Sequence, residues 1–400
     1  MRFAEVIGQQ ETKHHLVQMV QQNRLSHALL FLTKEGAGGL PLALAFAQYV
    51  TCEKVQRKNS AEAAPSLFGF DEPAVEQPAL DDACGECSSC LKAKAHIHPD
   101  IHYAYPVIPR KSGDKPKSTD YITEWREFAG SYPYGNVFDW LQFIGAENKQ
   151  GNITSDECGD ILRKLSLKSF ESEVKVLVMW MPEYLGNEGN KLLKLIEEPP
   201  QNTLFILVAE SEEKMLQTIL SRCQLVKIPA LEPGDITQRL ISRSNLEPEK
   251  AARVAMLAGG NFREALQLLQ HADEDWQSLL GDWLNAILRK GPAVQVKWIE
   301  DMAKLGREKQ KQFLQYFNHM LRQGIMLRVL GDRSVMSDED RVFAARLNKV
   351  ASVSQQEAII QELDNATYYI ERNANPKMLF HALTIKLLHI ITNKTLILTE

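Results

Sequence analysis

The chain has 400 residues, of which 44% are hydrophobic and 24% are charged, and its formal net charge at pH 7 is −5. This composition excludes global disorder and predicts a globular protein of two to four domains at roughly 100–200 residues per domain. The balance of 46 basic against 51 acidic residues argues against a free-standing DNA-binding protein driven by charge. The sequence contains no apolar run of about 18 residues and no signal-peptide pattern, so we expect a cytoplasmic protein with no membrane partner.

The first predicted elements are a strand and a helix joined by a glycine-rich loop. An apolar run, ALLF at 28–31, predicts the strand, and an alanine-rich amphipathic stretch at 40–50 predicts the helix. Between them lies KEGAGG, whose glycines are typical of a loop that cradles phosphate through its backbone N–H groups. The order of strand, loop and helix is therefore that of a phosphate-binding motif.

This loop lacks two side chains that phosphate chemistry requires. A phosphate-binding loop needs a lysine that reaches the β- and γ-phosphates and a Ser or Thr hydroxyl that holds Mg²⁺. Gly36 and Gly38 have the expected separation, but Gly39 stands at the lysine position and Leu40 at the hydroxyl position. The sequence predicts a degenerate phosphate loop that does not hydrolyse ATP, and a plain strand-to-helix turn remains the alternative.

A cluster of cysteines follows the first helix. Cys84, Cys87 and Cys90 occur within seven residues, and Cys52 lies just after the predicted helix. Four thiolates form a closed tetrahedral Zn²⁺ site, and a long flexible loop between the first ligand and the others adds little closure entropy. We predict a structural zinc module at 52–90, with buried free thiols as the alternative. His98 is a possible substitute ligand, but we expect it to be a turn residue.

Two stretches interrupt the regular pattern. The first, 53–83, ends in a part from 61 to 83 that holds six acidic residues and no Lys or Arg, which predicts a mobile insertion. The second, about 105–150, combines a basic polar stretch with an aromatic-rich segment. Its pattern does not predict a role.

Strands and helices then alternate, which predicts a parallel sheet covered on both faces. The predicted helices are 155–167 and 187–197, and the predicted strands are 174–181 and 204–208. The second helix should end before Pro199 and Pro200, which lack backbone N–H donors.

The strand at 174–181 should end in a carboxylate if the site held Mg²⁺ and water. Trp180 and Met181 stand where acids would be expected. Glu183 is either a displaced acid or a solvated turn residue. Two losses in one nucleotide site argue against an ATPase.

Beyond residue 230 the strand pattern ends. Short helical segments up to about residue 272 predict a small helical lid at 231–275, and apolar residues at three- and four-residue spacing predict an α-helical bundle at 276–400.

Four phrases in the chain, FAEVIGQ, RLSHALLF, NKLLKLIEEPPQNTLFIL and TILSRCQ, resemble the AAA+ clamp-loader family of bacterial DNA polymerase III. The resemblance covers residues 1 to about 270, and the main match beyond is IERNANPKMLF. The lost lysine and acids, combined with the retained SRC, resemble the delta-prime subunits of this family rather than its ATP-hydrolysing gamma or tau subunits. Ala209 and Glu210 also stand where the family has a threonine after a strand.

The resemblance implies a fold and a role. The fold is an α/β AAA+ domain at 1–230 that carries the zinc module, followed by the lid and by a C-terminal bundle for oligomerisation. The role is that of a non-catalytic clamp-loader subunit. Its partners would be the gamma or tau ATPase subunits, the delta subunit, the sliding clamp and, through the complex, primer–template DNA.

The resemblance also assigns residues. Ser221, Arg222 and Cys223 form the motif whose arginine points into the ATP site of a neighbouring subunit, where a guanidinium stabilises charge on the γ-phosphate. A surface salt bridge is the alternative for Arg222. Arg263 occupies the position of the second sensor arginine, but we favour a structural ion pair there.

Ser66, Leu67 and Phe68 resemble the tail of the Leu-Phe peptides that dock into sliding clamps, with an incidental apolar patch as the alternative.

Two other functions of the chain stay open. An active AAA+ ATPase is opposed by Gly39 and Leu40, and a zinc-containing DNA-binding adaptor is opposed by the overall acidity.

Overall fold

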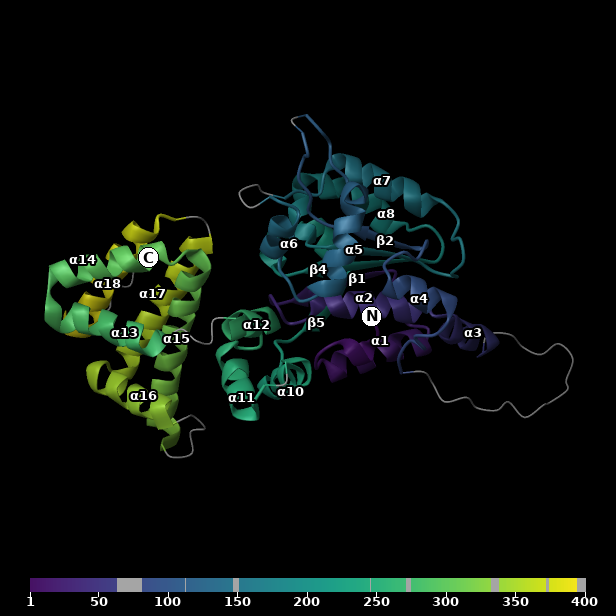
Figure 1. Ribbon diagram of the computed structural model, residues 1–400. Coiled ribbons are helices and arrows are strands. Elements are labelled where there is room, and N and C mark those ends of the chain that lie inside the picture. The colour runs from purple at the N-terminus through teal and green to yellow at the C-terminus, as the bar shows by residue number, and fades with distance from the viewer. Residues whose placement is uncertain are drawn as a thin grey trace, which may run out of the picture. The chain divides into compact units, whose positions relative to one another are not determined.

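The computed structural model describes residues 1–62, 81–111, 113–146, 151–244, 246–270, 275–331, 338–371 and 374–393. Ser66, Leu67 and Phe68 lie outside these described residues. The chain divides into two compact units, Met1–Gln267 and Leu268–Glu400 (Figure 1). The finer division of the first unit into an α/β domain and a lid stays a prediction.

A five-stranded sheet forms the centre of the first unit. Its strands are β1 Ala28–Thr33, β2 Ile101–Ala104, β3 Lys175–Trp180, β4 Thr203–Ala209 and β5 Gln224–Ile228, in the order β2-β3-β4-β1-β5. Every neighbouring pair is parallel, which confirms the predicted sheet. β3 and β4 are buried along their whole length, because a parallel sheet covered on both faces has no solvent side.

Two separate layers of apolar side chains cover the faces of this sheet. In β1, Leu29 and Phe31 point into one core, while Ala28 and Leu30 point into the other. The first core also takes residues from α1 (Gln10–Gln21) and α2 (Gly39–Val50), and the second takes residues from α7 (Ser155–Ser166). Figure 1 shows α7 and α1 on opposite sides of the sheet.

The first unit contains nine further α-helices among its described residues. Their bounds are α3 Glu53–Glu62, α4 Ser88–Lys94, α5 Ile122–Ser131, α6 Val137–Phe143, α8 Leu193–Glu197, α9 Gln217–Leu220, α10 Pro233–Ser244, α11 Pro248–Leu257 and α12 Phe262–Gln270. The last three confirm the short helices predicted after residue 230. The first part of the stretch for which we predicted a mobile insertion forms α3, and residues 63–80 of that stretch lie outside the described residues, so its mobility stays a prediction.

The prediction of one helix over 187–197 is wrong in its first part. The α-helix covers only Leu193–Glu197, and a 3-10 segment, η3 Pro182–Leu192, precedes it. Gly186 breaks this segment with φ 51° and ψ −143°, a conformation that a residue with a Cβ rarely adopts. The end of the helix is as predicted, because Glu198 has left helical geometry ahead of the two prolines.

The second unit is helical throughout its described residues. Its helices are α13 Trp276–Asn285, α14 Pro292–Lys304, α15 Arg307–Leu330, α16 Asp338–Val350, α17 Val353–Glu371 and α18 Pro376–Asn393. Trp283 and Trp298 stack at its centre with ring centroids 4.7 Å apart, and Phe313 and Phe380 pack around them. Across the described parts of both units, every helix is too short or too polar to cross a bilayer.

Candidate functional site

The glycine-rich loop leads from β1 into α2 at the carboxyl ends of the strands. Gly36 and Gly38 both have positive φ, at 67° and 98°, which explains why the turn uses glycine. A Cβ on Gly36 would lie 1.7 Å from the Asn261 Oδ1 atom, and the Phe262 amide donates to the Gly36 carbonyl at 3.1 Å. The residues that begin α12 therefore cover the loop from above.

Neighbouring side chains pack closely around Gly39 and Leu40, the two positions that lack the lysine and the hydroxyl of a phosphate-binding loop. A Cβ on Gly39 would lie 2.5 Å from the Thr33 methyl group and 3.0 Å from a Val208 methyl group. Leu40 is buried, and Pro41 supplies no N–H in the first turn of α2, where a phosphate would use the amides that a helix start leaves unpaired. A lysine at position 39 would need the β1 and β4 side chains to move.

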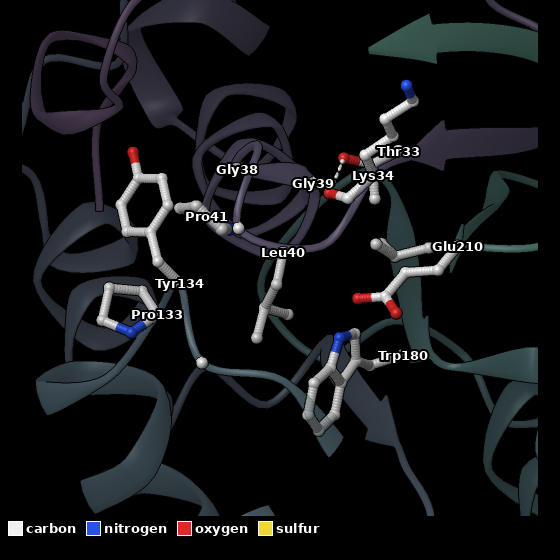
Figure 2. Close-up of a pocket in the computed structure, with 13 residues that line it drawn as sticks. Thr33, Lys34, Gly38, Gly39, Leu40, Pro41, Pro133, Tyr134, Trp180 and Glu210 are labelled. Atoms are coloured by element: carbon white, nitrogen blue, oxygen red, sulfur yellow. Dashed lines mark hydrogen bonds between the residues drawn. The ribbon is translucent and has the colours of Figure 1, made fainter. Parts of the chain in front are cut away.

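The space that remains at the loop is a cavity of about 20 Å³. That volume is enough for about one water molecule, whereas small-molecule sites occupy roughly 300–1,000 Å³. Figure 2 shows Leu40 pointing into this space between Tyr134 and Trp180, while Lys34 extends away from it. The Ile7 amide donates to the Tyr134 hydroxyl at 2.8 Å, which fixes the ring against the loop.

Trp180, which stands where an acid was expected, belongs to an aromatic cluster. Its ring centroid lies 5.5 Å from that of Trp125 and 5.9 Å from that of Phe128, both on α5. Trp125 also stacks on Tyr105 at 4.0 Å and meets Trp140 of α6 edge-on at 5.5 Å. The stretch at 105–150, whose role the sequence did not predict, thus supplies α5 and α6 as an aromatic cover for this edge of the sheet.

Two carboxyl groups, those of Glu183 and Glu210, follow β3 and β4 near the loop. The Oε1 atom of Glu183 accepts hydrogen bonds from the amides of Glu210 and Ser211 at 2.5 and 2.9 Å, and burial raises the pKa of Glu183. Glu183 is therefore not a solvated turn residue. Burial, together with the nearby charges of Glu35 and Glu183, raises the pKa of Glu210 to about 8.

Arg263 is buried and paired. Its Nε and Nη2 atoms donate to the two carboxylate oxygens of Asp139 at 2.5 and 2.7 Å, and its Nη1 atom lies 3.4 Å from Glu35. Asp139 is held in turn by the capping box with Asn136 that starts α6. The guanidinium is thus engaged in an ion pair that fastens α12 to α6.

Ser221, Arg222 and Cys223 lie at the opposite edge of the sheet, between α9 and the amino end of β5. The Arg222 side chain is 33% exposed, and its Nε atom donates to Glu197 Oε1 at 2.5 Å. Its Nη1 atom donates to the Thr218 carbonyl at 2.6 Å and to the Ser221 hydroxyl at 3.1 Å. Burial raises the pKa of the Cys223 thiol to about 11, which keeps it protonated and unreactive.

The four predicted cysteines come together. The sulfur atoms of Cys52, Cys84, Cys87 and Cys90 all lie within 4.8 Å of one another, and those of Cys84 and Cys90 are 3.8 Å apart. A tetrahedron with Zn–S bonds of about 2.3 Å has sulfur-to-sulfur edges of about 3.8 Å. The donor set therefore fits Zn²⁺.

Backbone amides also point at these sulfurs. The amide of Cys84 donates to the Cys52 sulfur at 3.5 Å, and the amides of Cys87 and Cys90 donate to the Cys84 and Cys87 sulfurs at 3.4 Å. Such bonds favour the thiolate form that binds metal. A hydrogen bond from the Cys90 thiol, together with the nearby amides, lowers the pKa of Cys52.

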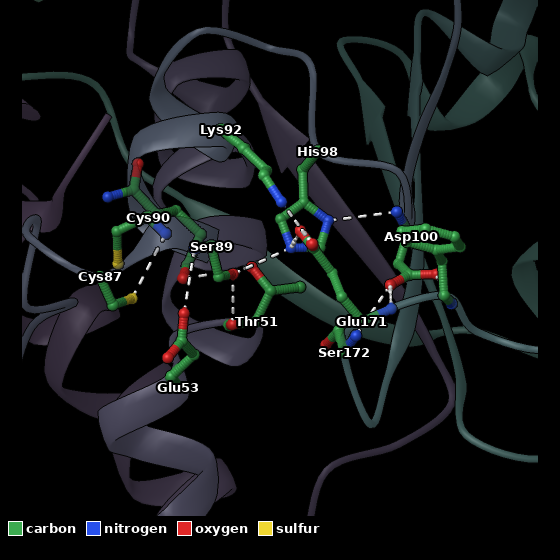
Figure 3. Close-up of polar contacts among 12 residues, drawn as sticks. Thr51, Glu53, Cys87, Ser89, Cys90, Lys92, His98, Asp100, Glu171 and Ser172 are labelled. Atoms are coloured by element: carbon green, nitrogen blue, oxygen red, sulfur yellow. Dashed lines mark hydrogen bonds and ion pairs between the residues drawn. The ribbon is translucent and has the colours of Figure 1, made fainter.

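A network of polar side chains lies next to the cysteine cluster (Figure 3). The Asp100 amide donates to His98 Nδ1 at 3.1 Å, so the proton of the neutral ring lies on Nε2, which is 2.9 Å from the Ser89 hydroxyl. Ser89 donates in turn to the Thr51 carbonyl at 2.6 Å. Both nitrogens of His98 are engaged, so His98 is not a ligand; it connects α4, through Ser89, to the segment that precedes β2.

Sequence reasoning missed three residues of these sites, namely Tyr134, Asp139 and Glu197. The Asn136–Asp139 capping box was a local signal for α6, but the contacts of all three join segments that are far apart in the chain. No local pattern marks such contacts.

Known proteins resemble this chain mainly in its first unit. The sequence model of a family described as DNA polymerase III, delta subunit, matches residues 8–232. DNA polymerase III subunit delta' of Bacillus subtilis is 26% identical over 254 residues, which cover 63% of this chain and 56% of that protein. DNA polymerase III subunit tau of the same organism is 27% identical over 333 residues, which cover 81% of this chain and 46% of that protein.

Among solved structures, a DNA polymerase III gamma subunit-related protein of Thermotoga maritima matches 94% of this chain and 99% of its own, with 14% identity and a TM-score of 0.36. The chain spans about half the length of the curated relatives it matches.

Proposed function

The chain belongs to the DNA polymerase III delta subunit family, and from this membership we propose that it is a non-catalytic, delta-prime-type subunit of a clamp loader. It would contribute an arginine to the ATP site of a neighbouring subunit without hydrolysing ATP itself. The observation that carries this proposal is the contrast between a filled phosphate loop and a partly exposed Arg222.

The filled loop supports the loss of nucleotide chemistry within the chain. A cavity of about 20 Å³ does not accommodate a nucleotide, and the lysine, hydroxyl and acid positions are occupied by Gly39, Leu40 and Trp180. Without an ammonium group or a metal-holding hydroxyl, the site lacks the main electrostatic contributions to phosphoryl transfer. These features speak against the alternative of an active ATPase.

The geometry of Arg222 supports a role in trans. A planar, permanently charged guanidinium at the surface can reach a phosphate on another chain, and arginines supplied in trans accelerate phosphoryl transfer by about 10³ to 10⁵ in other systems. The Ser221 hydroxyl and the Thr218 carbonyl orient the Nη1 side of the group. Cys223 is half-buried and packs against the second core of the sheet.

Zinc would have a structural role here. Cys52, Cys84, Cys87 and Cys90 would hold Zn²⁺ in a closed tetrahedral site, which leaves no position for a substrate and stabilises the fold. Because Cys52 follows α2 and the other three surround the start of α4, the site would fasten α4 to the AAA+-like core.

The partners follow from the role. We propose assembly with gamma or tau ATPase subunits and a delta subunit, action on the sliding clamp, and contact with primer–template DNA through the complex. The third alternative, a zinc-containing DNA-binding adaptor, is opposed by the net charge of −5 and by a cysteine cluster that packs into the core.

The test is reconstitution of the chain with its ATPase partners, sliding clamp and primed DNA. We expect Arg222→Ala to reduce DNA-stimulated ATP hydrolysis by about 10³, and Arg222→Lys to recover little of it because an ammonium group lacks the planar fork. The isolated chain should not turn over ATP. Full hydrolysis with Arg222→Ala, or turnover by the isolated chain, would refute the proposal.

A further inference from the structure

Glu197 is the partner that sets the orientation of Arg222. It is the last residue of α8, and Pro199 and Pro200 prevent the helix from continuing past it. Its Oε1 atom accepts from Arg222 Nε at 2.5 Å and also forms an ion pair with Nη2. The carboxylate therefore occupies one edge of the guanidinium, the edge formed by Nε and Nη2.

The guanidinium of Arg222 is hydrogen-bonded on two sides, at its Nε–Nη2 edge and at its Nη1 atom. A guanidinium has five N–H groups, and within the described residues four of them are engaged by Glu197, the Thr218 carbonyl and the Ser221 hydroxyl. A phosphate that binds the guanidinium through two parallel hydrogen bonds needs a whole edge. The Nη1 atom is turned toward its own backbone, so the phosphate must take the edge that Glu197 holds.

The pair with Glu197 is suited to exchange. Both side chains are partly exposed, at 33% for Arg222 and 42% for Glu197, and exposed ion pairs are weak. Only one carboxylate oxygen is used, so the contact lacks the strength of the two-oxygen fork that Asp139 makes with Arg263. A phosphate with more than one negative charge can therefore displace it.

We propose that Glu197 stands in for the phosphate of a neighbouring subunit. It positions the Arg222 guanidinium when no nucleotide is present, and it yields the Nε–Nη2 edge to the γ-phosphate when the neighbour binds ATP. Thr218 and Ser221 retain the Nη1 side throughout. Glu197 is thus a positioning residue, and this inference rests on the proposed role of Arg222 in trans.

The exchange predicts a specific kinetic signature for Glu197→Gln in the reconstituted complex. The variant keeps the shape of the side chain but removes the competing charge, so KM for ATP should fall by about 2- to 5-fold, in proportion to a weak surface pair. The kcat should stay within about 2-fold of the wild-type value. Glu198→Gln, which removes the same charge from the next residue, is the matched control and should leave both constants unchanged.

A second comparison separates this inference from the proposed function. In an Arg222→Ala background, Glu197→Gln should no longer change KM, because the group for which it competes is absent. If Arg222→Ala lowers hydrolysis but Glu197→Gln behaves like Glu198→Gln, raises KM or lowers kcat, the exchange is refuted and the arginine finger stands. If Arg222→Ala itself has no effect, the proposed function fails.

Discussion

The two edges of the parallel sheet have opposite characters. At the carboxyl ends of the strands, Leu40, Trp180 and Tyr134 fill the space, and the carboxyl groups of Glu183 and Glu210 are half-buried. At the amino ends, Arg222 and Glu197 form a polar pair at the surface. Apolar packing therefore dominates at the carboxyl ends of the strands, whereas a charged pair is accessible at their amino ends.

The largest effect is expected at the cysteine cluster, whose side chains pack against the first core. Cys90→Ser should abolish binding of one Zn²⁺ per chain and lower the thermal unfolding midpoint strongly, since structural zinc contributes about 10 kcal/mol or more in small domains. Zinc analysis by atomic emission and a thermal unfolding curve measure both effects. Cys158→Ser, in α7, should leave the zinc content intact, and a zinc-free wild-type protein would contradict the prediction.

The aromatic cover of the closed edge should be the next largest contribution. Trp125 is fully buried among Tyr105, Phe128 and Trp180, so Trp125→Ala should lower the free energy of unfolding by about 3–5 kcal/mol. Urea unfolding followed by circular dichroism measures the loss.

Phe138→Ala is the matched control for this cover. Phe138 lies on α6 but is largely exposed, so its removal should cost less than about 1 kcal/mol. Equal losses for the two variants would show that the cover does not stabilise the closed edge.

Those parts of the fold that depend on neighbouring residues could be predicted from the sequence. They are the strands β1, β3 and β4, which are apolar runs, the spacing of the cysteines, and the end of the helix before Pro199. β5 escaped prediction because QLVKI is an edge strand with alternate exposed positions, and β2 because it has only four residues.

The parts that could not be predicted depend on contacts across the chain. Tyr134 closes the loop through Ile7, and Glu197 holds Arg222 although 25 positions separate them. The helix predicted at 187–197 failed in its first part because the chain forms 3-10 turns up to Leu192, and the helical sequence pattern does not distinguish such turns from an α-helix. The spacing of apolar residues predicts which face of a helix or strand is buried, but it does not predict which residues from other parts of the chain contact that face.

Introducing a lysine at position 39 and a hydroxyl at position 40 tests whether the glycine-rich loop can bind ATP. Gly39→Lys combined with Leu40→Thr should not produce ATP binding, because the new Cβ would lie 2.5 Å from Thr33, and it should destabilise the chain by about 1–3 kcal/mol through overpacking. Equilibrium binding of a fluorescent ATP analogue and urea unfolding measure the two results.

A second glycine serves as the control for that double variant. Gly159 lies in α7, and a Cβ at this position would meet nothing within 4 Å, so Gly159→Ala should stabilise the chain by about 0.5–1 kcal/mol. Tight ATP binding by the double variant, Gly39→Lys with Leu40→Thr, would show that the loop opens readily and that the contrast between the edges is one of side chains alone.

The smallest expected effect is the pH dependence that Glu210 gives to the closed edge. Burial and the nearby Glu35 and Glu183 raise the pKa of Glu210 from 4.5 to about 8, so the folded chain holds this proton to a higher pH than the unfolded chain does. The contribution of Glu210 to stability is therefore complete below pH 4.5 and declines as the pH rises toward 8. Glu210→Gln, which cannot ionise, should match the wild type at about pH 4.5 and exceed it at about pH 8. The full change in pKa corresponds to roughly 4 kcal/mol at pH 8, and solvent screening of this half-buried carboxyl reduces the expected gain to about 1 kcal/mol. Unfolding free energies at the two pH values measure this gain. The control variant, Glu213→Gln at an exposed position, should not show it. If the stability of Glu210→Gln depends on pH as that of the wild type does, water reaches the Glu210 carboxyl and the carboxyl ends of the strands are less tightly packed than the structure indicates.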